Sequence, residues 1–281
     1  MLCISAIRLA YQDVKSSSVK ACLFLLLLFA GTILYANYTP QMVENNSIAD
    51  VFHVLFRDYS LTIIVIPVFL FLLSIILPSV MEPLRLVRYQ DRGNIAWALF
   101  TVIVVFVSIF LILYMLFGFL YGWWLSGSLE NTWKTEWGPP YIASDGNIDL
   151  ALFSTGYMVL RYVVTQFVAF MVIGLSAVLI YIMIPRFVYV FFIIEGLVVL
   201  DRELSSRYNV SWFIHQAEIS IANWGDAAYF ISIVTYFVGL MIVLSVAIYI
   251  VLRRKDFIPK LEDSTWHSFV RQKRCYIGIY C

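Results

Sequence analysis

Five long apolar stretches constrain this sequence more than any other feature. A helix that crosses a bilayer needs about 20 apolar residues, because each residue rises 1.5 Å along the helix axis. A sixth apolar stretch, 187–200, is shorter and follows directly after the fourth long one. The five long stretches are residues 21–38, 60–80, 95–121, 156–184 and 228–252. We therefore expect these helices to lie in lipid rather than in a water-excluding globular core.

The composition excludes the main classes of water-soluble protein. Hydrophobic residues make up 62% of the 281 residues and charged residues only 13%, whereas about 25% of a soluble domain is charged. The net charge of +1 offers no basic surface for nucleic acid. We predict an all-α, polytopic membrane protein with no nucleic-acid partner.

A break at Pro185-Arg186 separates the fourth long stretch from the short one. A single helix over 156–200 would be about 67 Å long, about twice the 30 Å thickness of the hydrocarbon core. An arginine inside an unbroken span would also be costly. The sequence therefore predicts a tight hairpin at this point and six spans in total.

The distribution of Lys and Arg predicts that both termini lie in the cytoplasm. In that orientation only four basic residues lie in outer segments, namely Arg57, Lys134, Arg202 and Arg207. Apart from Arg161 within a span, the other 14 of the 19 lie on the inner side. Such an excess is the positive-inside pattern of multi-pass membrane proteins.

The inner segment 79–93 carries the clearest helix signals outside the spans. Ser79 and Glu82 match a capping box, and Gly93 is a typical C-terminal stop. Its basic residues share one helical face at spacings of three and four: Arg85, Arg88 and Arg92. Two interpretations stay open, a docking helix for a partner and a basic loop that only sets the topology.

Three further segments outside the spans show helical or turn patterns. Residues 2–16 match an amphipathic helix on the inner membrane surface, with a frayed tail as the alternative. Turn signals in 122–155 predict a small extracytoplasmic lobe. Residues 201–227 carry an apolar helical stripe. That segment would lie at the outer interface, dip into the membrane or form a solvated loop helix.

Polar residues at membrane depth are functional candidates by default, because burying them in lipid is costly. Glu195 lies about 15 Å from the Pro185 turn and Arg161 about 36 Å from it, which disfavours an ion pair between them. Gln166 is another possible neighbour of Glu195. The alternative is that Glu195 is a structural carboxyl satisfied inside the bundle.

Two further features concern helix shape and packing. Pro67 is expected to kink the second span. Gly118 and Gly122 form a GxxxG pair that allows close packing against another helix.

Motifs for catalysis by this chain are missing. The sequence contains no GxxxxGK[ST], HExxH or GxSxG motif. We therefore expect no enzyme activity, no metal and no cofactor on this chain. An intramembrane enzyme built around Glu195 is a weaker hypothesis.

This layout resembles the membrane-spanning permease of bacterial type-2 ABC exporters over residues 1–258. Proteins of that family have six spans, both termini inside, an inner amphipathic helix before span 1 and a tight inner hairpin between spans 4 and 5. Short helices dip into the outer leaflet before span 6. Asp91-Arg92-Gly93-Asn94 is similar to a contracted form of the Glu-Arg-x-x-Gly-Thr stretch that many members carry before span 3. The cytoplasmic tail, 259–281, has no counterpart in that family.

The resemblance implies a division of labour between subunits. The helix between spans 2 and 3 would dock on a separate ATP-binding subunit, which holds ATP and Mg²⁺. A second permease copy, identical or not, would complete the translocation path, with spans 2 and 5 at the dimer seam. The residues implied in coupling are Glu82, Arg85, Arg88, Asp91 and Arg92.

The implied location is the bacterial cell membrane, where membrane lipid surrounds the spans. The implied cargo is amphipathic or apolar, such as an antimicrobial or toxic peptide or a drug. A membrane sensor or assembly scaffold that transports nothing is the alternative function.

Overall fold

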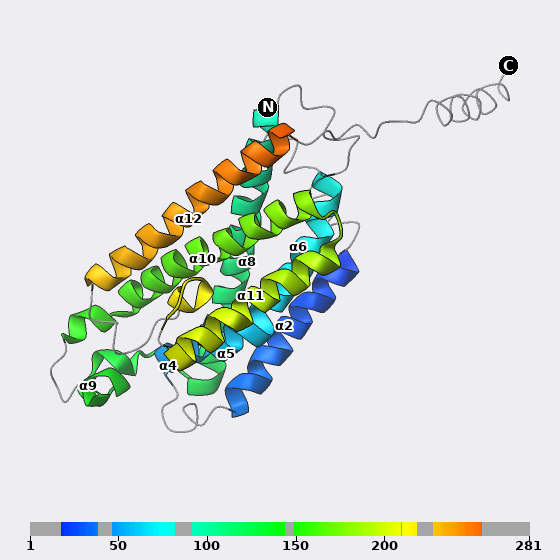
Figure 1. The fold of residues 1–281 in the computed structure, drawn as a ribbon. Coiled ribbons are helices and arrows are strands. Elements are labelled where there is room, and N and C mark those ends of the chain that lie inside the picture. The colour runs from blue at the N-terminus through cyan, green and yellow to red at the C-terminus, as the bar shows by residue number, and fades with distance from the viewer. Residues whose placement is uncertain are drawn as a thin grey trace, which may run out of the picture.

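The computed structural model describes residues 18–38, 47–81, 92–143, 149–208, 210–217 and 227–254. Within these ranges the regular elements are helices, and no strand is present. The prediction of an all-α protein is confirmed. Figure 1 shows a bundle whose long helices are α2 (Ser18–Tyr38), α6 (Ile66–Val80), α8 (Arg92–Ser126), α10 (Thr155–Met183), α11 (Phe187–Tyr208) and α12 (Ala227–Arg254).

Five segments of the described chain are long and apolar enough to cross a membrane. They coincide with the five long apolar stretches of the sequence and extend most of them by a few residues. These segments are Ser18–Asn37, Leu61–Pro78, Gly93–Ser126, Thr155–Met183 and Ala227–Arg254. The multi-helix membrane architecture therefore agrees with the sequence.

Helix α11 does not meet the same criterion of length and composition, although its 22 residues would extend over about 33 Å. Its C-terminal half is charged, with Asp201, Arg202 and Glu203 in succession. The helix continues past the apolar stretch 187–200 to Tyr208. An i,i+4 ion pair between Arg207 and Glu203, 3.2 Å apart, lies in this exposed extension.

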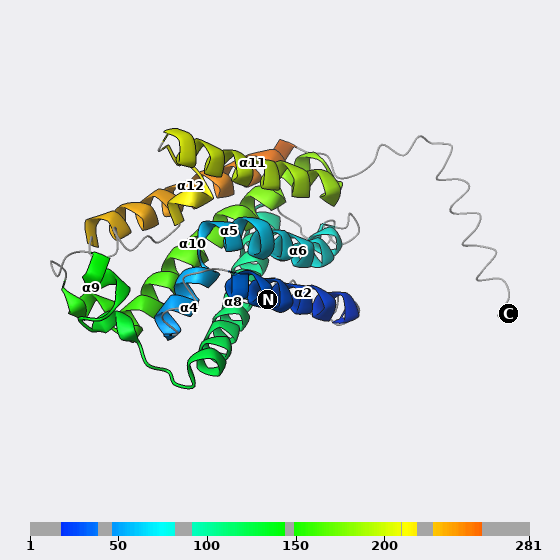
Figure 2. The same ribbon diagram turned by 90° about the horizontal axis from the view of Figure 1, so that it is seen from below.

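Helix α10 is the centre of the bundle. It packs against α12, α8, α11 and α6, and about two thirds of its apolar segment is buried. Gly174 permits the close crossing with α8, because a Cβ atom there would lie 2.7 Å from Ile103 Cγ2. Figure 2 shows that α8 and α6 lie between α2 and α12.

The break between α10 and α11 lies at the predicted position. The Ile184 amide donates to the Ile180 carbonyl at 2.7 Å, which ends α10, and Arg186 N–H donates to the Ile184 carbonyl at 2.7 Å. Pro185 has no N–H to continue the helix. Figure 1 shows α11 returning antiparallel to α10, and α12 then running parallel to α10.

A π-helical turn, η1 (Leu61–Val65), immediately precedes α6. Pro67 is the second residue of α6, and its ring excludes the carbonyl of residue 63 from a regular helical bond. Widening the preceding turn relieves that clash, and π turns are a common cause of helix kinks. This π-helical turn lies directly before Pro67, where the sequence predicts a kink.

The boundaries predicted for the inner segment 79–93 are wrong at both ends. Ser79 lies in the last turn of α6 and so is not an N-cap. Gly93 is the second residue of α8 and so is not a helix stop. The apolar stretches on each side extend their helices into the segment, and residues 82–91 lie outside the described ranges.

A short helix, α4 (Ile48–Leu55), packs against α8 at Gly118 and Gly122. A Cβ atom at Gly118 would lie 2.9 Å from Leu55 Cδ1, and one at Gly122 would lie 3.3 Å from Ile48 Cγ1. Helix α8 ends at Gly127, whose φ of 66° is left-handed. The pair therefore serves close packing within the chain.

Beyond Gly127 the chain folds into a small lobe, which we name for the outer side predicted from its sequence. This lobe contains η2 (Thr132–Lys134), α9 (Pro139–Ala143) and η3 (Leu150–Phe153), beside α4. Trp133 and Phe153 are almost completely buried. We use "outer lobe" for α4 and these three elements.

Candidate functional site

The predicted coupling residues lie largely outside the part of the chain that the structure describes. Glu82, Arg85, Arg88 and Asp91 fall in the range that separates α6 from α8. Arg92 is the first residue of α8, and its side chain is not among those described. The amphipathic segment 2–16 and the tail 259–281 also lie outside the described ranges. The docking interpretation therefore stays a prediction.

Glu195 lies on α11 at the boundary between a buried and an exposed surface. Ile194 and Val198 on one side are buried, whereas Phe192 and Val199 on the other side are 67% and 47% exposed. Its Oε1 atom is buried and has no hydrogen-bond partner among the described residues. A carboxyl in this position is adjacent to whatever covers the exposed side of α11.

A row of phenylalanine rings links three helices next to Glu195. Phe24 of α2 stacks on Phe71 of α6 with centroids 5.3 Å apart, and Phe71 stacks on Phe191 of α11 at 4.8 Å. Phe191 in turn meets Phe192 edge to face at 5.6 Å. We call these four residues and Glu195 the aromatic face.

The aromatic face was not predicted from the sequence. The chain contains 22 phenylalanines, and nothing in their spacing distinguishes these four from residues that face lipid. Only the pairing of α2, α6 and α11 brings them together.

Gln166 does not meet Glu195 in the structure. Its Nε2 atom donates to the Ala217 carbonyl at 3.2 Å, and its side chain is buried. Ala217 ends the short turn η4 (Ile214–Ala217), which lies between α10 and α11 in Figure 1. Gln166 thus satisfies the carbonyl of the last residue of a short 3-10 helix, as membrane burial requires.

Asp201 of α11 anchors residues 210–217, which we call the return segment. Its Oδ1 atom accepts hydrogen bonds from the amides of Trp212 at 2.8 Å and Phe213 at 3.0 Å, and from the Ser211 hydroxyl at 3.4 Å. Asp201 is completely buried. Tyr236 of α12 adds a hydroxyl bond to the Trp212 carbonyl. Residues 210–217 are therefore held against the bundle, which excludes a solvated loop helix for this segment.

Arg161 lies in the second turn of α10, and only 2% of it is exposed. Its predicted position at the outer interface stays a prediction. Its guanidinium carbon lies 5.3 Å from the ring centroid of Phe230 at the start of α12. A cation–π contact of this kind attaches the N-terminal ends of α10 and α12 to each other.

A buried polar cluster connects α4 to η2 within the outer lobe. Asp50 completes a capping box with Ser47, and its Oδ1 atom accepts Trp133 Nε1 at 2.6 Å. Burial raises the pKa of the Asp50 carboxyl, while the bonds from Trp133 and Ser47 oppose the rise. Burial, with a smaller effect of Arg57, lowers the pKa of His53 to about 4. This imidazole is therefore neutral at pH 7.

The three polar regions differ in what they can do. The Asp50 cluster and the Asp201–Gln166 anchors have their partners within the chain and hold elements in place. Glu195 lies beside an exposed apolar surface, and its buried Oε1 atom has no hydrogen-bond partner among the described residues. Comparison with protein families, curated proteins and solved structures gave no match to this chain.

Proposed function

We propose that this chain is the membrane-spanning permease of an ATP-driven exporter. It would act with a second permease copy and with a separate ATP-binding subunit in the cell membrane. The observation that carries the proposal is the path of α10, α11 and α12, which run alternately in opposite directions (Figure 1). With α11 as a crossing segment, the bundle crosses the membrane six times, as in the type-2 exporter permeases that the sequence resembles.

The charged outer half of α11 is compatible with such a crossing. Measured from the Pro185 turn, Asp201 lies about 24 Å along the helix, near the outer edge of a hydrocarbon core about 30 Å thick. The charges that follow it would lie at headgroup depth. Asp201 itself is shielded by the amides of the return segment. Only Glu195 then places an ionisable group of α11 deep in the membrane.

The aromatic face supports the presence of a second permease copy. A carboxyl near the middle of the bilayer is costly when it meets lipid, and a protein surface that covers α11 removes that cost. The exposed neighbours of Glu195 include Val188 and Phe192, at 64% and 67% exposure. In this proposal the copies meet along α6 and α11.

Cysteine crosslinking in membranes tests the dimer seam. Phe192→Cys in a cysteine-free background is expected to form a disulfide-linked dimer on oxidation. Val243→Cys, on the exposed side of α12, is the matched control and is expected to stay monomeric. Equal crosslinking at both positions would remove the proposed seam.

The coupling role of the inner segment is tested by charge reversal. Changing Arg85, Arg88 and Arg92 to Glu should leave membrane insertion intact. It should also lower ATP hydrolysis by the purified complex with its ATP-binding subunit at least tenfold. Wild-type hydrolysis in the triple variant would refute the docking role.

A matched charge reversal on the opposite side controls for the loss of three positive charges. In this control, Glu replaces three basic residues that lie on the outer side in the proposed topology: Lys134, Arg202 and Arg207. This second triple variant is expected to retain ATP hydrolysis.

The outer lobe favours one alternative, a membrane sensor or scaffold that recognises a partner outside the cell. Its interior is built around Trp133 and Asp50, more than a simple loop requires. Purification without any ATP-binding subunit would favour this alternative.

A further inference from the structure

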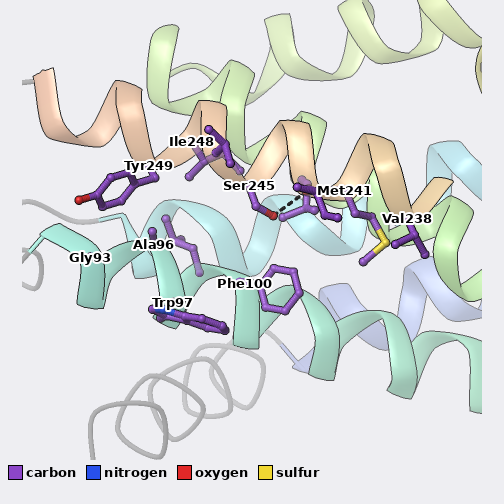
Figure 3. A pocket seen from close by; sticks show the side chains of 13 residues that line it. Gly93, Ala96, Trp97, Phe100, Val238, Met241, Ser245, Ile248 and Tyr249 are labelled. Atoms are coloured by element: carbon purple, nitrogen blue, oxygen red, sulfur yellow. Dashed lines mark hydrogen bonds between the residues drawn. The ribbon is translucent and has the colours of Figure 1, made fainter. Parts of the chain in front are cut away.

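A long apolar groove lies between α8 and α12, away from the aromatic face. Figure 3 shows Gly93, Ala96, Trp97 and Phe100 of α8 on one wall and residues of α12 on the other. Its volume is about 430 Å³, within the range of about 300–1,000 Å³ for ligand sites. Ser245 lines it too, but its hydroxyl donates to the Met241 carbonyl at 2.7 Å within the helix. The groove therefore presents almost no free polar group.

The length of the groove matches one leaflet of a membrane. Its α12 wall extends from Val238 to Tyr249, which is about 16 Å along the helix. Half of the hydrocarbon core is about 15 Å thick. Trp97 and Tyr249 lie at the end of the groove near the start of α8 (Figure 3), and such side chains are typical of the interface with headgroups. The geometry matches an acyl chain that enters from that end.

Among the described residues of α8 and α12, the charged side chains at this end of the groove are positive. Arg253 and Arg254 form the last turn of α12 and are exposed. Arg253 follows Tyr249 by one helical turn and so lies on the same face. Neither α8 nor α12 contains an Asp or Glu residue. An anionic headgroup would meet two cations there without facing a like charge from either wall.

We propose that this groove binds one acyl chain of an anionic phospholipid, whose phosphate lies beside Arg253 and Arg254. The inference needs only that α8 and α12 lie in a membrane. It does not depend on transport, on an ATP-binding subunit or on the seam at the aromatic face.

Native mass spectrometry of the purified full chain tests this binding. The probes are phosphatidylglycerol and phosphatidylcholine with identical acyl chains, added together in equal amounts. One phosphatidylglycerol should be retained in preference to phosphatidylcholine. Each arginine near an anionic lipid contributes about fivefold to affinity, so Arg253→Gln with Arg254→Gln should lower the preference by roughly an order of magnitude.

A second variant tests the groove itself. Ser245→Phe places a ring in the groove and should abolish retention of either lipid. Val243→Phe adds the same ring to an exposed position on α12 outside the groove and should leave retention unchanged. Unaltered elution and thermal stability establish that both variants fold.

Three outcomes would overturn the proposal. Wild-type protein that retains both lipids equally would exclude the role of the arginines. Retention by Ser245→Phe at the wild-type level would place the lipid elsewhere. A dimer that Ser245→Phe dissociates would identify the groove as a contact between copies of the chain.

Discussion

Removing the Asp201 carboxylate should release the return segment from the bundle. In Asp201→Ala, the amides of Trp212 and Phe213 lose their acceptor, which holds them at 2.8 and 3.0 Å. A hydrogen bond to a charged group contributes about 1.5–3 kcal/mol, so the two together contribute at least about 3 kcal/mol. Local opening of 210–217 should then become about 150-fold more frequent, since 1.36 kcal/mol corresponds to a factor of ten.

Hydrogen exchange with mass spectrometry on peptides that cover 210–217 measures this opening. Asp201→Asn keeps an oxygen acceptor without the charge, and charge-assisted bonds are about twice as strong as neutral ones. Its exchange should rise only about tenfold. Glu203→Ala removes the exposed ion pair with Arg207 on the same helix and should change little, because such pairs contribute at most about 1 kcal/mol. Unchanged protection in Asp201→Ala would refute the anchoring role.

Three further predictions concern packing and the outer lobe. Gly118→Ala should lower stability by about 1–3 kcal/mol through overpacking, whereas Gly239→Ala, in open space, should be neutral or stabilising; thermal unfolding of both in detergent distinguishes them. Because burial lowers the pKa of His53 from 6.5 to about 4, the contribution of the neutral imidazole to folding stability is fully present above pH 6.5 and is lost as the pH falls from there through about 4. A His53→Gln variant should lack this acid sensitivity between pH 7 and 4. Trp133→Phe removes the indole donor to the Asp50 carboxylate and should lower the unfolding temperature, and a transition unchanged from wild type would contradict that bond.

The lengths of the apolar stretches and the positions of the charged residues between them allowed most of the helical framework to be predicted. Lipid accepts only backbone that is hydrogen-bonded internally, so each long apolar stretch had to become a helix. The break at Pro185 followed from the missing amide and from the excessive length of a continuous helix. The glycine pair of α8 was recognised by spacing, although its partner, α4, was not.

The details that were wrong lie where helices leave the lipid. Ser79 and Gly93 match capping signals, but the adjoining apolar helices extend past both. The apolar stretch 187–200 ends at the first charges of α11, but the helix continues to Tyr208, and Asp201 is buried beneath the amides of the return segment. A local pattern cannot reveal that a charge meets partners from a segment ten residues away.

The candidate sites depend on contacts between distant parts of the chain. Gln166 was recognised as a polar group at membrane depth, but its acceptor is the carbonyl of Ala217. The aromatic face and the groove between α8 and α12 each require two or three helices to be placed side by side. Apolar residues that line such features have the same composition as those that face lipid, so sequence patterns cannot separate them.

Cysteine accessibility on both sides of a sealed membrane tests the central claim of six crossings. In a variant without native cysteines, Gly127→Cys follows α8, Arg186→Cys lies in the α10–α11 turn and Lys260→Cys follows α12. An impermeant maleimide should label position 127 from outside the cell, and positions 186 and 260 only after the inner side is exposed. Labelling of positions 127 and 260 from the same side would mean that an even number of crossings separates them, and would contradict the account.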